Sequence, residues 1–403
     1  MSSSAYRNPS RQRNRRDNGY FSPMAKKAIS VAAVVFFSIG YYETTSASVL
    51  LYEINVNQRT ENHAFNQTLP QQKFNLLRFL RLKTDLPTVE TNTLTPQVGN
   101  SSILQVGLNN YAEADQNNNK SNSSSSLINQ YGNLGFAKLF QKGDINYSSI
   151  DHIDDGQNTQ IRQQGSLLTS ETSLSGFNNA LFSQQEGASQ LATTLQEGRG
   201  HSAFTEQLGQ LNTLLIWQND PGSSGSLAQI NQDGAGNNGM VLQGIYGASQ
   251  PSDIYIDQVG NAHTAWVGQY HGNNRARIKQ EGWIGNQADI YQSQDSSATI
   301  MQFGQMNTAL VDQGGNSRVQ RAQLLQAGSD NVATVMQRGQ GHNANIRQQG
   351  QANEARILQR SLEISANSKE GNYAFISQYG FDNHANVEQF GNRNTVTVNQ
   401  RAY

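Results

Sequence analysis

The sequence predicts an all-β fold, a β-solenoid of amyloid-like strand–turn–strand rungs with about 22 residues each, preceded by a disordered N-terminus. Glutamine recurs every eleven residues over most of the chain. Side-chain character alternates with period two between these glutamines, which is the periodicity of a strand and not of a helix. Only 35% of the 403 residues are hydrophobic and 15% are charged, so ordinary apolar cores cannot account for a chain of this length.

The charge balance and the cysteine count exclude several classes of function. The chain carries 29 Lys and Arg against 30 Asp and Glu, a formal net charge of -1. Nothing in this balance indicates a nucleic-acid partner, and we expect none. Because cysteine is absent, thiol catalysis, disulfide scaffolds and cysteine-based zinc sites are excluded.

The first 47 residues have the features of a targeting segment rather than of a folded domain. Residues 1–23 form an Arg-rich extension that we expect to be disordered. Residues 24–47 read as a secretory signal, with two lysines, an apolar run over 28–42 and small residues at 45–47. We expect translation to start at Met24 and cleavage to follow Ala47. The apolar run is shorter than the roughly 20 residues that span a bilayer, and a non-cleaved anchor is the alternative.

Residues 48–96 form a separate N-terminal segment. Its most apolar stretch is 74–82, which Pro70 and Pro87 bracket. Periodicity fits either a short amphipathic helix or a strand there, so the pattern does not decide between them.

Residues 97–403 contain the repeat. With glutamine as slot 0, the motif is Q-x-G-x-x-N-x-A-x-[IV]-x-Q. Continuing the phase from Gln280 places Tyr291 in slot 0 and Asp289 in slot 9. The glutamines and asparagines expected to form amide ladders are Gln130, Gln141, Gln163, Gln196, Gln207, Gln258, Gln269, Gln302, Gln337, Gln348, Gln378, Gln389, Gln400, Asn146, Asn212, Asn274, Asn307, Asn331, Asn353 and Asn383. The expected turn glycines are Gly132, Gly143, Gly198, Gly209, Gly260, Gly304, Gly339, Gly350, Gly380 and Gly391.

The slots define a rung. Slots 5, 7, 9 and 11 share one parity, so on a strand their side chains point to one face. Glycine in slot 2, and Gly, Asn, Asp or Ser in slots 3 and 4, tolerate positive φ and allow the chain to reverse. Two units then form one rung, with Ala and Ile or Val between the facing strands. Amides of successive rungs stack at about 4.8 Å and pair, which removes the cost of burying them.

The units at 326–337, 348–359 and 378–389 resemble the curlin repeat, and the resemblance extends over roughly 97–403. Curlins are subunits of curli, the extracellular amyloid fibres of bacterial biofilms. The resemblance implies a secreted fibre subunit for adhesion and biofilm matrix. Its partners would be further copies, other curlin subunits and the outer-membrane curli secretion machinery. By the same resemblance, 48–96 takes the place of the segment that guides a subunit to its secretion channel.

The chain departs from a regular curlin pattern. Slot 9 is polar at Thr172, Ser183, Thr194 and Thr205, and insertions interrupt the phase at 218–232, 243–258 and 313–326. Such irregularity slows or localises amyloid growth. The sequence therefore leaves open a major fibre subunit, a minor nucleator and a non-polymerising adhesive solenoid.

We expect no catalytic, cofactor or metal site. His152, His201, His263 and His342 replace ladder residues and lack partners at ligand spacing, so polar substitution is favoured over metal binding. The acidic stretch at 151–156 lacks the ligand pattern of a calcium loop, and a weak turn-bound calcium is the alternative. Solenoid enzymes and ice-binding solenoids are the rival classes. A solenoid enzyme would need a stripe of acidic residues along a cleft, and an ice-binding protein would need regular outward pairs of threonines. The sequence contains neither pattern.

Outward aromatic side chains offer another surface. They are Tyr131, Tyr270, Phe303, Tyr379 and Phe390, which follow a slot-0 glutamine, together with Trp217, Trp266 and Trp283. They could bind sugars or neighbouring fibrils, or they could only cover the solenoid.

Overall fold

The computed structural model describes residues 100–117, 124–244, 250–293, 295–315, 319–361 and 371–402. These residues belong to one compact unit, Leu94–Tyr403. The predicted extension at 1–23, the signal at 24–47 and the segment at 48–96 lie outside the described residues. No helix that could cross a membrane is found in the described part of the chain.

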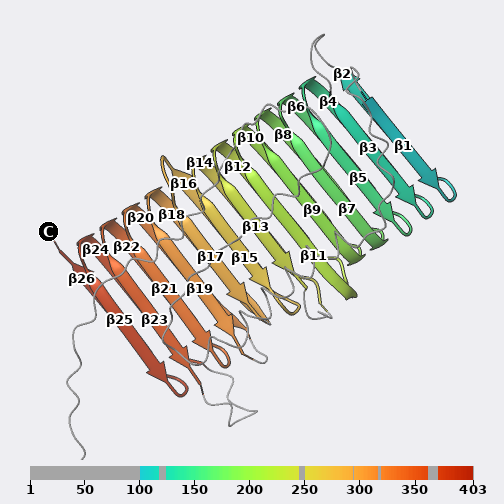
Figure 1. The fold of residues 1–403 in the computed structure, drawn as a ribbon. Coiled ribbons are helices and arrows are strands. Elements are labelled where there is room, and N and C mark those ends of the chain that lie inside the picture. Colours follow the sequence, from blue (N-terminus) through green and yellow to red (C-terminus); the bar gives the residue numbers. More distant parts are fainter. Residues whose placement is uncertain are drawn as a thin grey trace, which may run out of the picture. The chain divides into compact units, whose positions relative to one another are not determined.

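The predicted all-β solenoid is confirmed. The described residues form two parallel sheets of 13 strands each, and the chain alternates between them with every strand (Figure 1). We call them the odd and the even sheet. The odd sheet contains β1 (Asn100–Val106), β3 (Ser125–Tyr131), β5 (Tyr147–Ile153), β7 (Thr169–Phe177), β9 (Leu191–Arg199), β11 (Thr213–Ser224), β13 (Asn238–Gln243), β15 (Thr264–Gln269), β17 (Gln287–Gln292), β19 (Thr308–Gly314), β21 (Val332–Arg338), β23 (Glu354–Arg360) and β25 (His384–Phe390). The even sheet contains β2 (Tyr111–Asn117), β4 (Phe136–Asp144), β6 (Asn158–Ser166), β8 (Ala180–Ala188), β10 (Ser202–Gln210), β12 (Leu227–Ala235), β14 (Asp253–Asn261), β16 (Arg275–Gly282), β18 (Ser296–Gln305), β20 (Gln320–Ser329), β22 (Asn343–Gln351), β24 (Tyr373–Phe381) and β26 (Thr395–Arg401).

Neighbouring strands pair in register, so equal slots of successive rungs lie side by side. Gln348 pairs with Gln378 and Gly350 with Gly380, for example. Most rungs advance by 22 residues, but the step from Gln348 to Gln378 is 30 residues. Extra residues enter mainly at the turns, so the strand register survives insertion.

Small and β-branched side chains fill the space between the sheets, as the slot pattern predicts. Ala355 and Ile357 of β23, like their equivalents in other strands, are buried. The apolar core nevertheless divides into two clusters, one from Ile128 to Ile161 and one from Leu181 to Val387. Between them, β7 places the polar Ser170 and Thr172 at the core positions that Ala and Ile or Val usually occupy, and no β7 residue belongs to either cluster.

The turns use positive φ at two positions. The slot-2 glycines adopt it, and so does the residue in slot 4. The sequence suggested Gly, Asn, Asp or Ser there, yet Leu134, Ile145, Leu211 and Met306 also occupy the left-handed region. That conformation costs roughly 1–2 kcal/mol. Rung-to-rung hydrogen bonds between turn backbones offset the cost, such as the one that Leu211 N donates to Ala188 O at 3.0 Å.

The phase predicted between Gln280 and Gln302 is wrong by one residue. Gln292, not Tyr291, lies in slot 0, because its amide joins the hydrogen-bonded column between Gln269 and Gln313. Ile290 fills the core, and Asp289 points outward beside Trp266. The turn after Gln280 is one residue longer than eleven-residue counting allows.

Candidate functional site: amide columns and sheet edges

The glutamines of the even sheet form one continuous column. Each donates from Nε2 to Oε1 of the glutamine in the next rung, at 2.7–2.9 Å. The column begins at Gln116 and ends at Gln400. It contains the predicted Gln141, Gln163, Gln207, Gln258, Gln302, Gln348, Gln378 and Gln400. All donors point toward the C-terminal end of the stack, so the column has a direction.

The same amide groups tie the two sheets together. Gln163 Nε2 also donates to Tyr147 O at 3.0 Å, and Gln348 Nε2 donates to Val332 O at 2.9 Å. In both cases the carbonyl belongs to the strand that faces the glutamine across the rung. These additional acceptors explain why fully buried amides do not destabilise the stack.

The odd-sheet column contains the predicted Gln130, Gln196, Gln269, Gln337 and Gln389, and it is interrupted. His152 and Leu174 occupy two successive places in it, between Gln130 and Gln196. His152 Nδ1 lies 3.2 Å from Gln130 Nε2, and its Nε2 lies 2.8 Å from Thr159 Oγ1. Leu174 offers no donor, and the buried Gln196 Oε1 has no hydrogen-bond partner among the described residues. The column is regular again from Gln196 to Gln389.

Asparagines in slot 5 have two roles. Asn307, Asn331, Asn353 and Asn383 stack amide on amide, with each Nδ2 donating to Oδ1 of the preceding rung at 2.8–3.1 Å. The first acceptor is Asn286, which the shifted phase concealed. The Nδ2 groups of Asn146, Asn212 and Asn274 donate to backbone carbonyls of the turns. In the next rung, the residues aligned with these three asparagines are Leu168, Asn237 and Ser296. Each of them donates its backbone N–H to the asparagine Oδ1. The stacking asparagines make the same turn contact in addition to the amide–amide bond, as Asn353 does with Gly380 O.

All predicted turn glycines have positive φ, between 91° and 128°. Most of them also lie directly against the turn of the next rung. A Cβ added to Gly350 would be 2.0 Å from Gly380 O, and one added to Gly143 would be 2.0 Å from Gly165 O. At Gly391, in the last rung, the nearest atom would be 3.9 Å away. The glycine column therefore permits the close rung spacing on which the amide columns depend.

The terminal strands leave one backbone edge without a strand partner among the described residues. β1 and β2 pair only with β3 and β4, and β25 and β26 pair only with β23 and β24. Each terminal rung carries the column residues, Gln105 and Gln116 at one end and Gln389 and Gln400 at the other. Both ends therefore present the interior pattern of the stack.

The other histidines also replace column residues. His263 Nδ1 accepts from Asn286 N at 3.1 Å, and His342 Nδ1 accepts from Asn372 N at 3.1 Å. These contacts match those that slot-5 asparagine Oδ1 atoms make. Burial lowers the pKa of both imidazoles. Within the described ranges, no three His, Asp or Glu side chains gather as metal ligands would.

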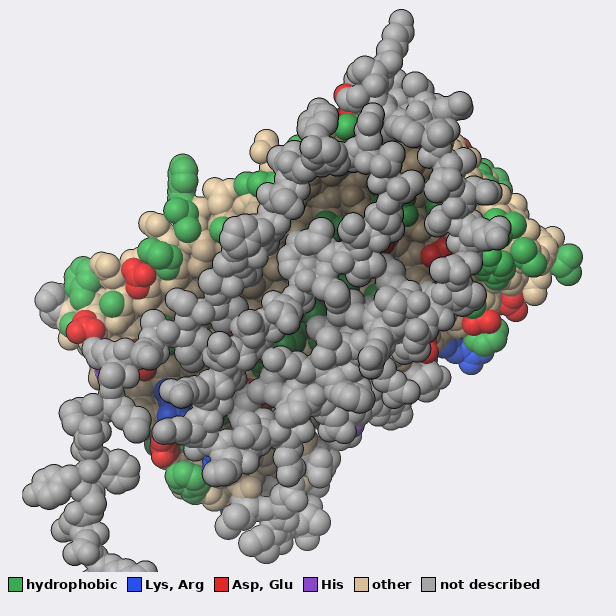
Figure 2. Space-filling model, viewed as in Figure 1, with side chains coloured by type: hydrophobic (Ala, Val, Ile, Leu, Met, Phe, Trp, Pro, Cys, Tyr) green, Lys and Arg blue, Asp and Glu red, His purple; other side chains and the backbone are tan. Residues whose placement is uncertain are grey.

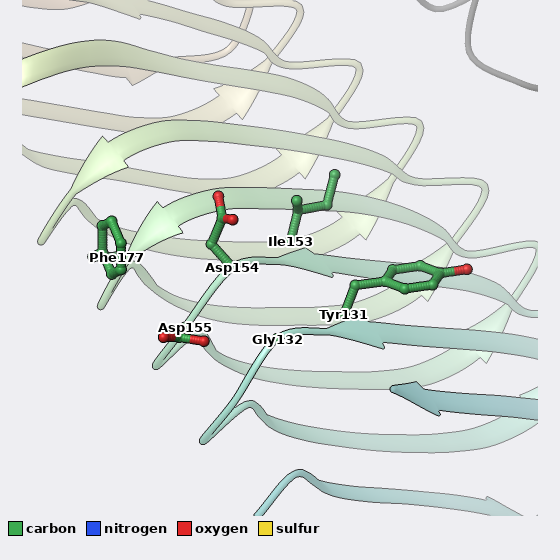
Figure 3. Close-up of a pocket in the computed structure, with 6 residues that line it drawn as sticks. All are labelled: Tyr131, Gly132, Ile153, Asp154, Asp155 and Phe177. Atoms are coloured by element: carbon green, nitrogen blue, oxygen red, sulfur yellow. The ribbon is translucent and has the colours of Figure 1, made fainter. Parts of the chain in front are cut away.

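The acidic stretch at 151–156 lines a hollow of about 280 Å³ with Tyr131, Gly132 and Phe177 (Figure 3). The two of its three carboxylates that line the hollow, on Asp154 and Asp155, accept hydrogen bonds from neighbouring rungs on opposite sides. Asp154 Oδ2 accepts from Gly176 N at 3.0 Å, and Asp155 Oδ1 accepts from Asn133 N at 2.7 Å. The side chains diverge in Figure 3, so this geometry favours turn stabilisation over a shared cation.

The aromatic side chains differ in exposure. Tyr131, Tyr379 and Phe390 are exposed, and Trp283 is 79% exposed at the tip of a turn. Tyr270, Phe303, Trp217 and Trp266 are half-buried. The sequence did not show that these last two lie on the same sheet face.

His152 gives the stack a sensitivity to acid. Burial lowers the pKa of its imidazole to about 4, against about 6.5 in an unfolded chain. Because the unfolded state binds the proton more tightly, the contribution of neutral His152 to folding stability is fully present above pH 6.5. This contribution is lost as the pH falls from 6.5 toward 4. We expect this loss to be at most about 3 kcal/mol, and His152→Gln to remove it. Urea denaturation of both chains at pH 7 and pH 4.5 measures the difference, and parallel pH profiles would contradict it.

Comparison with known proteins gives one family match. Residues 370–391 match the model of the curlin associated repeat, a segment that contains the whole of β24 and β25. A search of curated proteins found no significant match. The chain therefore contains one recognised curlin-type repeat within a solenoid whose other rungs have the same slot geometry.

Proposed function

We propose that this protein is a structural subunit of a secreted, curli-like amyloid fibre that grows by end-to-end β-stacking and supports adhesion and biofilm matrix. The observation that carries the proposal is that both terminal rungs repeat the interior pattern and leave strand edges unpaired in the described chain. Such edges template further strands unless they are blocked. In this role the chain needs no active site, cofactor, metal or nucleic acid.

The direction of the Gln columns favours head-to-tail addition. In the C-terminal rung, Gln389 Nε2 and Gln400 Nε2 each donate to a facing carbonyl, and a second proton on each nitrogen remains for the next rung. The N-terminal rung of another chain would bring Gln105 Oε1 into the acceptor position. Stacking with the opposite sense would place donors against donors. A heterologous contact of this kind does not close, so it produces a filament.

A minor, nucleating subunit is the second candidate. The break at His152 and Leu174 separates an irregular N-terminal part from a regular C-terminal one, where Asn286 to Asn383 also stack. A chain with one regular block suits a template better than a subunit that must add rapidly at both of its ends. Both proposals include export through an outer-membrane curli secretion machinery, guided by residues 48–96, because the curlin resemblance implies it.

Assembly kinetics test the proposal directly. Residues 48–403 are diluted from denaturant and followed by thioflavin-T fluorescence and electron microscopy. We expect a lag phase, fibres, and elimination of the lag by added seeds. If trace amounts accelerate a separate curlin far more than they assemble themselves, the nucleator role is favoured. A stable soluble monomer with strand-type circular dichroism would reject the fibre proposal and leave an adhesive solenoid.

A further inference from the structure

The two ends of the stack carry an excess of opposite charge. At the N-terminal end, the described residues within 100–157 contain six Asp and Glu against two Lys. At the C-terminal end, the described residues within 343–402 contain five Arg against three Asp and Glu. The space-filling view shows charged side chains scattered among polar ones over the visible described surface (Figure 2). Ends of opposite charge attract each other when two chains meet head to tail.

The register of the even sheet determines which charges meet at such a junction. In this sheet, the column glutamines of neighbouring strands pair with one another from β2 to β26. When the same register continues into the next chain, Gln400 pairs with Gln116. Asn399 then lies opposite Asp115, and Arg401 lies two positions beyond Asn399 on the same face of its strand.

The same diagonal relation already joins an arginine to an aspartate inside the stack. Arg338 of β21 lies two positions beyond Met336, the residue that pairs with Asp312 of β19. The two side chains form an ion pair, in which Arg338 Nη1 donates to Asp312 Oδ1 at 2.8 Å. Diagonal neighbours in a sheet are within reach of long side chains. An arginine placed two positions beyond the partner of an aspartate can therefore pair with it.

Asp115 and Arg401 are both available for a contact between chains. Both residues are exposed, and neither side chain forms a hydrogen bond or an ion pair with another described residue. The nearby Lys138 pairs with Glu113 instead, at 3.0 Å. Asp115 belongs to β2 and Arg401 to β26, which are the two outermost strands of the even sheet. The next chain is therefore the partner that these two positions fit.

We propose that Arg401 of one chain pairs with Asp115 of the next, and that the opposite charges of the two ends steer head-to-tail addition. The inference rests on the fibre proposed above and adds the contact that selects the orientation and the register of each junction. Two C-terminal ends would bring an excess of Arg together. A shift by one rung, with β4 in the place of β2, would put Arg401 opposite Lys142, where like charges repel.

Charge reversal in seeded elongation tests the ion pair. Monomer and seeds are of the same variant, so that every junction carries the change. We expect Arg401→Asp and Asp115→Arg each to slow elongation about three- to fivefold at low ionic strength. The difference from wild type should fall below about twofold in 1 M NaCl, because salt screens exposed charges. The chain with both substitutions should elongate at the wild-type rate.

A mixture of the two single variants distinguishes a contact between chains from an effect on the fold. In alternating order, every junction of the mixture again brings one arginine against one aspartate, so the mixture should elongate close to the wild-type rate. The matched control is Arg347→Asp, which changes the net charge equally at an exposed position of β22, away from the junction. It should leave the elongation rate unchanged.

The outcomes separate this inference from the proposed function. If wild-type chains form fibres and the single reversals do not slow them, or if mixing the variants gives no rescue, the ion pair is overturned and the fibre proposal stands. If wild-type chains form no fibres, the fibre proposal is overturned and the junction with it.

Discussion

Thr397→Pro is expected to stop seeded fibre growth while the solenoid remains folded. In β26, backbone groups of even-numbered residues face β24, since Tyr373 N donates to Asn394 O at 2.8 Å and Ala402 N donates to Tyr379 O at 3.0 Å. Alternation along a parallel strand then directs the Thr397 N–H to the open edge. Proline removes that donor and adds ring bulk there, without breaking a bond to β24.

The effect should be large because every contact between chains uses this edge. In head-to-tail stacking, β26 of one chain meets β2 of the next, whichever end of the fibre grows. Loss of one hydrogen bond and the ring clash together exceed about 1.4 kcal/mol, so we expect elongation to slow at least about tenfold. Thr397→Val is the matched control, because it keeps the N–H and a β-branched side chain. Elongation of Thr397→Pro monomer on Thr397→Pro seeds at the wild-type rate would show that growth does not pass through β26.

Gly234→Ala is expected to destabilise the solenoid by about 3–5 kcal/mol. Its φ is 127°, and an added Cβ would lie 1.9 Å from Gly260 O, which is backbone and cannot move aside. The rungs on either side would have to separate, and their Gln and Asn bonds would lengthen together. The change is measured as a shift of the urea denaturation midpoint.

The same turn supplies the control. Gly236 has φ of 68°, and a Cβ there would meet nothing within 4 Å. Gly236→Ala should therefore cost only about 1–2 kcal/mol, the ordinary penalty for a left-handed alanine. Equal destabilisation by the two substitutions would mean that rung spacing does not depend on the glycine column.

The eleven-residue period was sufficient to predict the all-β solenoid, the sheet face to which each slot points, and the turns. It could not locate Gln292 and Asn286, because a turn tolerates one extra residue without any signal in the strand that follows. It also could not tell which asparagines stack on each other. Asn212 and Asn353 both donate to a turn carbonyl, but Asn353 also donates to the Asn331 amide. Whether that additional bond forms depends on the residues in adjacent rungs, about 22 positions away.

The grouping of outward aromatic residues on the odd sheet was not visible in the sequence for a related reason. Eleven-residue counting treats all units as equal, but odd and even units lie on opposite sheets. Outward residues such as Trp217 and Trp266 come together only when every second unit is aligned. Leu174 likewise looks like a harmless exception in a list of glutamines, although in the described part of the chain it leaves the Gln196 carbonyl oxygen without a hydrogen-bond partner.

The polar filling at β7 affects how the molecule comes apart. In a stack, each rung contacts only its neighbours, so unfolding cooperativity passes from one interface to the next. The interface at Ser170 and Thr172 lies between two apolar clusters, neither of which includes a residue of β7. Heating or pulling the chain should therefore release the rungs up to β6 before those from β8 onward. A single melting temperature does not describe such a molecule, which melts as two blocks of unequal strength.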